Sequence, residues 1–217
     1  MTRTLASTLT LLIPSLLVLT NIYFFMTPQY LAFEYGKAGF PKAERFSDAD
    51  RFKFSSLSLA YVRGDATLDA FKAMGVYDAR EIKHMVDVRE LVAKVNVFYA
   101  LDAALVLIAL VALGKNKETR ALAARALFNA GRLTLGLFVG IGLFAAFGFQ
   151  TFFTLFHRIF FEGDTWLFNY TDSLIQFYPL PFWFDTSILL VALTIGEAIV
   201  VGAIGWAWQR AINKEPA

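Results

Sequence analysis

Four long apolar segments constrain this chain more than any other feature of its sequence. Each is long enough to cross the hydrocarbon core of a bilayer, which takes about 20 mostly apolar residues in a helix. A barrel would instead show short strands of alternating polarity, so helices are expected. The sequence therefore predicts an all-α, polytopic membrane protein with four transmembrane helices, at about residues 5–26, 95–114, 133–156 and 186–209.

The first apolar segment could also be interpreted as a secretory signal. Its apolar run is long for the hydrophobic region of a signal, and no small-x-small cleavage site follows Met26. We therefore expect a retained helix. The chain has no cysteine, which excludes disulfides, thiol nucleophiles and thiolate metal sites.

The distribution of basic residues predicts the orientation of the chain. The loop 115–132 carries five basic residues and one acidic residue, Glu118. Arg3 flanks the first span, and Arg210 and Lys214 flank the last. Since basic residues gather on the cytoplasmic side of membrane proteins, we expect both termini there. Segments 27–94 and 157–185 are then extracytoplasmic.

Helical patterns continue through the long extracytoplasmic segment. An amphipathic helix is expected to begin at Ser47 or Asp48 and to stop at Gly64, and a short one runs from about Thr67 to Met74. A third begins near Asp78 and continues into the second span. These helices predict a small helical cap on the outer side.

The only two histidines of the sequence are predicted to reach the same outer interface. His84 lies in a charged stretch that runs into the second span, and His157 directly follows the third. Histidine is the side chain best matched to proton transfer near neutral pH. Glu81 and Asp87 are within helical reach of His84. Around His157 the sequence places three carboxylates, Asp164, Asp172 and Asp185.

Two carboxylates interrupt the apolar spans themselves, Asp102 in the second and Glu197 in the fourth. Intramembrane carboxylates are costly and usually face a polar cavity. Alternatively, each could stay neutral or pair with a neighbouring helix. The sequence leaves both interpretations open.

Aromatic residues are unusually dense from Phe147 to Trp183, on both sides of a turn at residues 162–164. Tryptophan and tyrosine favour the headgroup region of a membrane, so this segment is expected to anchor the protein. It could also form a wall for lipid chains beside His157. No phosphate-binding loop, nucleophile elbow or metalloprotease motif occurs, and basic residues in short flanking loops give no support for nucleic-acid binding.

Two blocks of sequence resemble a known family. Residues 81–88, Glu-Ile-Lys-His-Met-Val-Asp-Val, resemble the Glu-x-x-His-Met-x-Asp-Val block of the DUF1461 membrane proteins, which include the lipoprotein intramolecular transacylases. The second block of the family is similar to His157–Phe161, Trp166–Phe168, Asp172–Ile175 and Tyr178–Asp185.

This resemblance implies a bacterial plasma-membrane enzyme that needs no metal or organic cofactor. Its substrate would be a diacylated lipoprotein, whose sn-2 acyl chain moves to the amine of the N-terminal cysteine. The family's catalytic histidines match His84 and His157, and we expect His157 to act as base with His84 as its partner, oriented by Asp87. The other supporting residues expected at this site are Glu81, Asp164, Trp166, Asp172 and Asp185.

Two other functions remain open at this stage. A non-enzymatic subunit of a membrane complex could ligate haem or chlorophyll through the two imidazoles, because histidine is a common axial ligand. A structural subunit of a larger complex would use neither chemistry.

Overall fold

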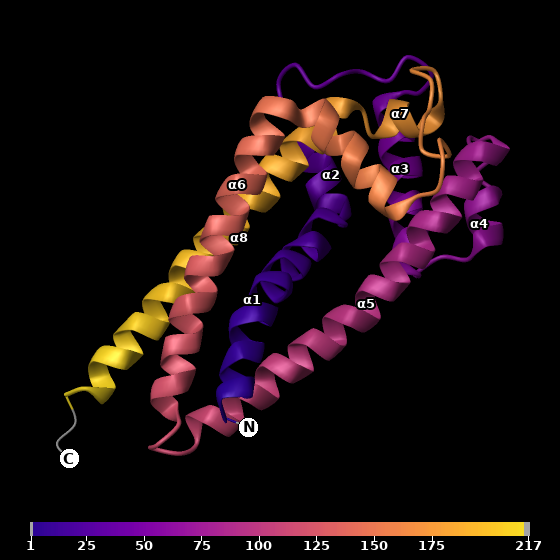
Figure 1. Ribbon diagram of the computed structural model, residues 1–217. Coiled ribbons are helices and arrows are strands. Elements are labelled where there is room, and N and C mark those ends of the chain that lie inside the picture. The colour runs from indigo at the N-terminus through magenta and orange to yellow at the C-terminus, as the bar shows by residue number, and fades with distance from the viewer. Residues whose placement is uncertain (1, 215–217) are drawn as a thin grey trace. The chain divides into compact units, whose positions relative to one another are not determined.

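The computed structural model describes residues 2–214, and within them every regular element is a helix. Four helices are long enough and apolar enough to cross a membrane. Figure 1 shows them as the long ribbons α1, α5, α6 and α8. Their bounds are Thr2–Phe25, Ala79–Gly114, Arg120–Phe160 and Leu180–Ile212. The predicted all-α fold with four candidate spans is confirmed.

Two compact units share these helices. The first contains α1 up to Ile22, the segment Val97–Phe144 of α5 and α6, and α8 from Ile188 onward. The second contains the outer segments Tyr23–Asn96 and Ala145–Ser187. It includes four short helices besides the ends of the long ones: α2 (Pro28–Tyr35), α3 (Asp48–Arg63), α4 (Leu68–Lys72) and α7 (Ser173–Phe177).

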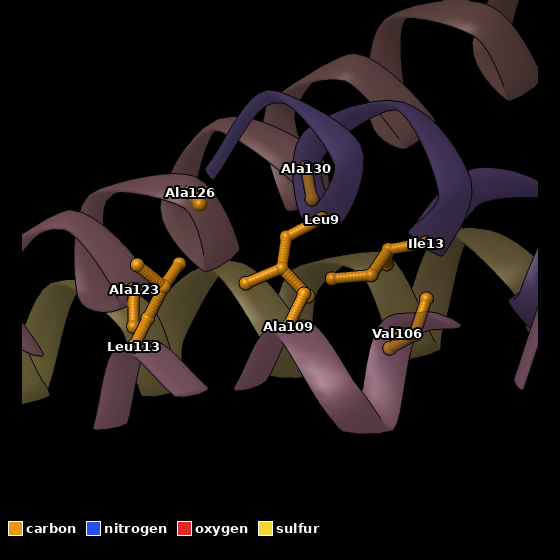
Figure 2. Close-up of a cluster of buried hydrophobic side chains, with 8 residues drawn as sticks. All are labelled: Leu9, Ile13, Val106, Ala109, Leu113, Ala123, Ala126 and Ala130. Carbon is orange, nitrogen blue, oxygen red and sulfur yellow. The ribbon is translucent and has the colours of Figure 1, made fainter. Parts of the chain in front are cut away.

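The core of the first unit is built from aliphatic side chains that meet small ones. Figure 2 shows Leu9 and Ile13 of α1 facing residues of α5 and α6. Four of the eight clustered residues are alanines, Ala109, Ala123, Ala126 and Ala130. Small residues let helix backbones approach closely, which favours van der Waals packing where lipid provides no hydrophobic driving force.

Both intramembrane carboxylates pair with a neighbouring helix within this unit. The Ser15 hydroxyl of α1 donates to Asp102 Oδ2 at 2.7 Å. The Asn21 amide donates to Glu197 Oε2 at 2.8 Å and to the hydroxyl of Thr194 at 3.2 Å. Of the two interpretations left open by the sequence, pairing with a neighbouring helix is the one observed.

Two of the four short outer helices, α3 and α4, follow the predicted signals, whereas α2 and α7 were not predicted. The Ser47 hydroxyl caps α3 by accepting from the backbone N–H of Asp50, and Gly64 ends the helix at φ 90°. That φ is left-handed, a region that glycine enters without the steric cost paid by other residues. Thr67 caps α4 in the same way as Ser47 caps α3. These local signals explain why the expected helices of the cap form.

Helices α5 and α6 extend beyond the segments needed to cross a bilayer. The first turns of α5 carry charged residues and precede the predicted span at residue 95. In α6, Gly148 has non-helical dihedrals, φ −137° and ψ 41°, so Phe149–Phe160 forms a separate helical segment in the second unit. This kink was not predicted from the sequence. His84 and His157 both lie outside the predicted spans.

Close helix packing in the first unit predicts the effect of one glycine substitution. A Cβ at Gly205 of α8 would meet the backbone of α6, with the Ala124 carbonyl oxygen at 2.7 Å. We expect Gly205→Ala to destabilise the protein by about 1–3 kcal/mol, because backbone atoms cannot yield as side chains do. Thermal unfolding in detergent measures the effect. Gly140→Ala is the matched control, since a Cβ there meets nothing within 4 Å; equal losses in both variants would contradict the prediction.

Candidate active site

The two histidines of the chain lie side by side in the second unit. His84 comes from the second turn of α5 and His157 from the last turns of α6. The centroids of their rings are 6.5 Å apart, and the ring planes differ by 24°. His84 is only 8% exposed, and His157 is half-buried. The predicted convergence of these distant positions is confirmed.

Aromatic rings surround the two imidazoles. Phe161 contacts both, with centroid distances of 4.8 Å to His84 and 5.7 Å to His157. Phe153 and Trp166 lie 4.1 and 4.7 Å from His157, and Phe168 lies 5.4 Å from His84. The indole N–H of Trp166 donates to the carbonyl of Gly163, which fixes its ring. Since these rings exclude water, electrostatic interactions at the site are stronger than in solvent.

A backbone carbonyl selects the tautomer of His157. Its Nδ1 lies 2.7 Å from the carbonyl oxygen of Phe153, one turn earlier in α6. A carbonyl only accepts, so Nδ1 carries the proton in this hydrogen bond. In the neutral ring, Nε2 then holds the free lone pair. His157 is therefore preorganised as a base at one defined atom.

The environment favours the neutral form of both rings. Burial lowers the pKa of His84, a charge on His157 lowers it further, and the carboxylate of Asp87 opposes these effects. Burial also lowers the pKa of His157, against the hydrogen bond to Phe153. Nδ1 of His84 is buried and has no hydrogen-bond partner within residues 2–214. Two neutral imidazoles near neutral pH provide a base and a second polar group without an ion pair.

Glu81 has a different role from the one predicted. Its carboxylate is 2% exposed and accepts the backbone N–H groups of Asp78 at 2.9 Å and Leu174 at 2.7 Å. Leu174 lies in the first turn of α7, so Glu81 joins the start of α5 to that helix. It accordingly fixes the backbone around His84 and makes no hydrogen bond to the imidazole.

None of the four aspartates that the sequence placed near the histidines makes a hydrogen bond to an imidazole within the described residues. Asp87 pairs with Lys83 at 3.3 Å and makes no hydrogen bond to His84, so the expected orienting contact is absent. Asp172 accepts from the N–H of Asn169 and from Arg80, at 2.7 and 3.2 Å. Asp185 pairs with Lys37 at 2.9 Å. Asp164 is exposed and has no side-chain hydrogen bond within the described residues.

Of the residues predicted to support the histidines, Trp166 is the one whose ring packs against an imidazole, and phenylalanines form the rest of the aromatic surroundings. Phe153 was predicted only as part of the aromatic segment, and Phe161 also as part of the second family block. Their spacing gave a sharper signal, since residues four before and four after His157 share its helix face. No group of three or more metal-ligating side chains occurs in the described part of the chain.

These observations define a class: a polytopic, helical membrane protein with a paired-histidine site in aromatic surroundings. The chain belongs to the lipoprotein intramolecular transacylase (Lit) family, a family of acyltransferases, whose model matches residues 5–183. The matched range contains the whole first block and the second block up to residue 183. The resemblance seen in the two sequence blocks is thereby confirmed.

The chain is also similar to one further protein in sequence and to solved structures in fold. A protein of Aquifex aeolicus (strain VF5), described as uncharacterized, is 28% identical over 180 residues, which cover 80% of each chain. The membrane-integral lipoprotein intramolecular transacylase Lit of Bacillus cereus has the same fold, with a TM-score of 0.80 at 18% identity. That match covers 99% of this chain and 96% of the other. A variant of the Bacillus protein with one histidine replaced by alanine matches with a TM-score of 0.72.

The bonds made by Glu81 predict a stability effect. We expect Glu81→Ala to lower stability by about 1–3 kcal/mol, because two backbone N–H groups lose their acceptor in a buried position. Glu81→Gln should lose less, since its amide oxygen can still accept one of them. Thermal unfolding of the purified variants provides the measurement, with Glu90→Ala, on the exposed face of α5, as the control. An unfolding midpoint for Glu81→Ala equal to that of the control would refute the role of this carboxylate.

Proposed function

We propose that this protein moves the sn-2 acyl chain of a diacylglyceryl lipoprotein to the α-amino group of its N-terminal cysteine. The product is a lyso-form lipoprotein. The observation that carries the proposal is the adjacency of His84 and His157, with Nε2 of His157 free to accept a proton. Membership of the Lit family supports the substrate class.

The reaction needs a base, an acid and stabilisation of negative charge. The amine nitrogen attacks the ester carbonyl carbon while Nε2 of His157 accepts a proton from it, which gives a tetrahedral intermediate with a negative oxygen. An N–H of His84 donates to that oxygen. The bond between the carbonyl carbon and the sn-2 oxygen then breaks, and the imidazolium of His157 returns its proton to the leaving oxygen. An amide and a free hydroxyl result, and atoms and charge balance.

Holding both reacting groups on one substrate molecule supplies much of the rate. Ester and amine belong to the same lipid-anchored residue, so the attack is intramolecular and avoids the entropy cost of a collision. The enzyme's contribution is then orientation, proton transfer and exclusion of water, which could otherwise hydrolyse the ester. The rings of Phe161 and Trp166 beside the imidazoles fit this last task.

Exposed apolar side chains near His157 provide contact with acyl chains in this proposal. Phe156, Ile159 and Phe160 of α6 are all more than 40% exposed, as is Leu167 in the following loop. The substrate would enter from the outer leaflet, where both histidines lie if the basic loop 115–132 is cytoplasmic. We accordingly place the protein in the bacterial cell membrane with both termini in the cytoplasm.

Histidine substitutions test the proposed roles directly. We expect His157→Ala and His84→Ala each to slow formation of lyso-form lipoprotein by about 10²–10⁴-fold, since each removes a positioned acid–base group. Mass spectrometry of lipoprotein N-termini measures this after incubation of the purified variant with diacylated lipoprotein in liposomes. Arg158→Gln, at an exposed position next to His157, should retain activity. Undiminished transfer by a folded histidine variant would remove that residue from the mechanism.

The lowered pKa of His157 predicts the position of the acid limb of the rate profile. The base must be neutral, and a lowered pKa keeps it neutral to lower pH. After correction for the fraction of neutral substrate amine, whose pKa is about 7.7–8.0, transfer in a single turnover should therefore persist at pH 6.5, the ordinary pKa of histidine, and decline only below it. Rates measured from pH 4.5 to 8 check this. Half of the maximal rate at pH 6.5 or above, after the same correction for the amine, would contradict a buried, neutral base.

A further inference from the structure

A groove in the first unit has no role in the proposed acyl transfer. It runs between α1 and α6 and has a volume of about 340 Å³. Thr10 lines the groove and links the two helices. Its hydroxyl donates to the carbonyls of Ala6 in α1 and Ala126 in α6, at 3.1 and 3.3 Å. One wall belongs to the first predicted span, and the other, residues 122–129, to the part of α6 that precedes the third.

Three polar side chains that line the groove have no protein partner within residues 2–214. Arg125 and Asn129 are four residues apart on α6, so they share one face of that helix, opposite Ser7 of α1. All three side chains are exposed, and within residues 2–214 they have no hydrogen-bond or ion-pair partner. Arg125 lies in the basic segment 115–132 that flanks the third predicted span, where its guanidinium is available to an anionic lipid headgroup.

The charge around the groove selects an anion. The segment 115–132 contains five basic residues against Glu118 alone, and Arg3 precedes Ser7 on α1. The guanidinium of arginine matches phosphate oxygens with two parallel hydrogen bonds. Basic sites between helices on the cytoplasmic side of membrane proteins bind phosphorylated headgroups.

The order of groups along the groove matches one class of molecule. Ser7 and Arg125 lie in the second turn of their helices, while Leu11 and Asn129 lie one turn further, about 5.4 Å deeper along the axis. Leu11 is 65% exposed. A phosphate at Arg125 therefore places glycerol esters near the amide of Asn129 and an acyl chain against Leu11.

We propose that this groove binds an anionic glycerophospholipid through Arg125, with Asn129 and Ser7 as additional hydrogen-bonding groups. The site is separate from the histidines, and the proposal does not depend on acyl transfer. With the orientation argued above, the lipid belongs to the cytoplasmic leaflet. It bridges α1 and α6 and adds to the stability of the folded protein.

Lipid titration of the purified full-length protein in detergent tests this site. Phosphatidylglycerol should raise the midpoint of thermal unfolding, and native mass spectrometry should show it bound. Arg125→Gln should bind it roughly tenfold more weakly, the loss expected for a charge-assisted hydrogen bond. Lys117→Gln, in the same basic segment but outside the groove, is the matched control and should bind like the wild type.

Three comparisons make the outcome decisive. Equal stabilisation by phosphatidylcholine would overturn selection for an anionic headgroup, and equal stabilisation by inorganic phosphate would overturn a lipid ligand. Equal weakening by Arg125→Gln and Lys117→Gln would reduce the effect to general surface charge. If Arg125→Gln does not fold, Asn129→Ala replaces it, with weaker lipid binding expected and unchanged binding contradicting the proposal.

Discussion

The buried carboxylate of Glu81 holds together the segments on which the site depends. It lies less than one turn before His84 and binds the first turn of α7 through the N–H of Leu174. The chain between His157 and α7 carries Phe161, Trp166 and Phe168, which contact the imidazoles. One side chain thereby fixes the position of His84 relative to the end of the loop that surrounds it. Its two hydrogen-bond donors are backbone groups, which suits a structural task better than proton transfer.

The two units are stabilised by different kinds of packing. In the first, lipid removes the hydrophobic driving force for helix association, so alanines and glycines allow close packing and the carboxylates of Asp102 and Glu197 find partners on α1. In the second, aqueous and apolar surfaces meet, and short capped helices bury a cluster of aromatic residues. The histidines belong to the second unit, where charged groups can be solvated and burial can still tune an imidazole.

Prediction from sequence succeeded where local periodicity or topology decides the outcome. Apolar length identified the four long helices, and Ser47, Gly64 and Thr67 marked the ends of the cap helices. The convergence of His84 and His157 was predicted from the number of spans, because four spans place both residues on the same side of the membrane. The hydrogen-bond partners of the carboxylates could not be predicted, because closeness in sequence does not fix the direction in which a side chain points. Glu81 accepts a hydrogen bond from a backbone N–H nearly a hundred residues away, and Asp87 pairs with Lys83 instead of His84.

The hydrogen bond from His157 to Phe153 has a consequence for genetics. Its acceptor is a main-chain oxygen, which every amino acid supplies, so no replacement of the Phe153 side chain deletes it. Scanning mutagenesis would thus miss the hydrogen bond that places the proton on Nδ1 of His157. An ester in place of the peptide bond after Phe153 would weaken that hydrogen bond. The side chain at position 153 can therefore change during evolution while the hydrogen bond that orients His157 is kept.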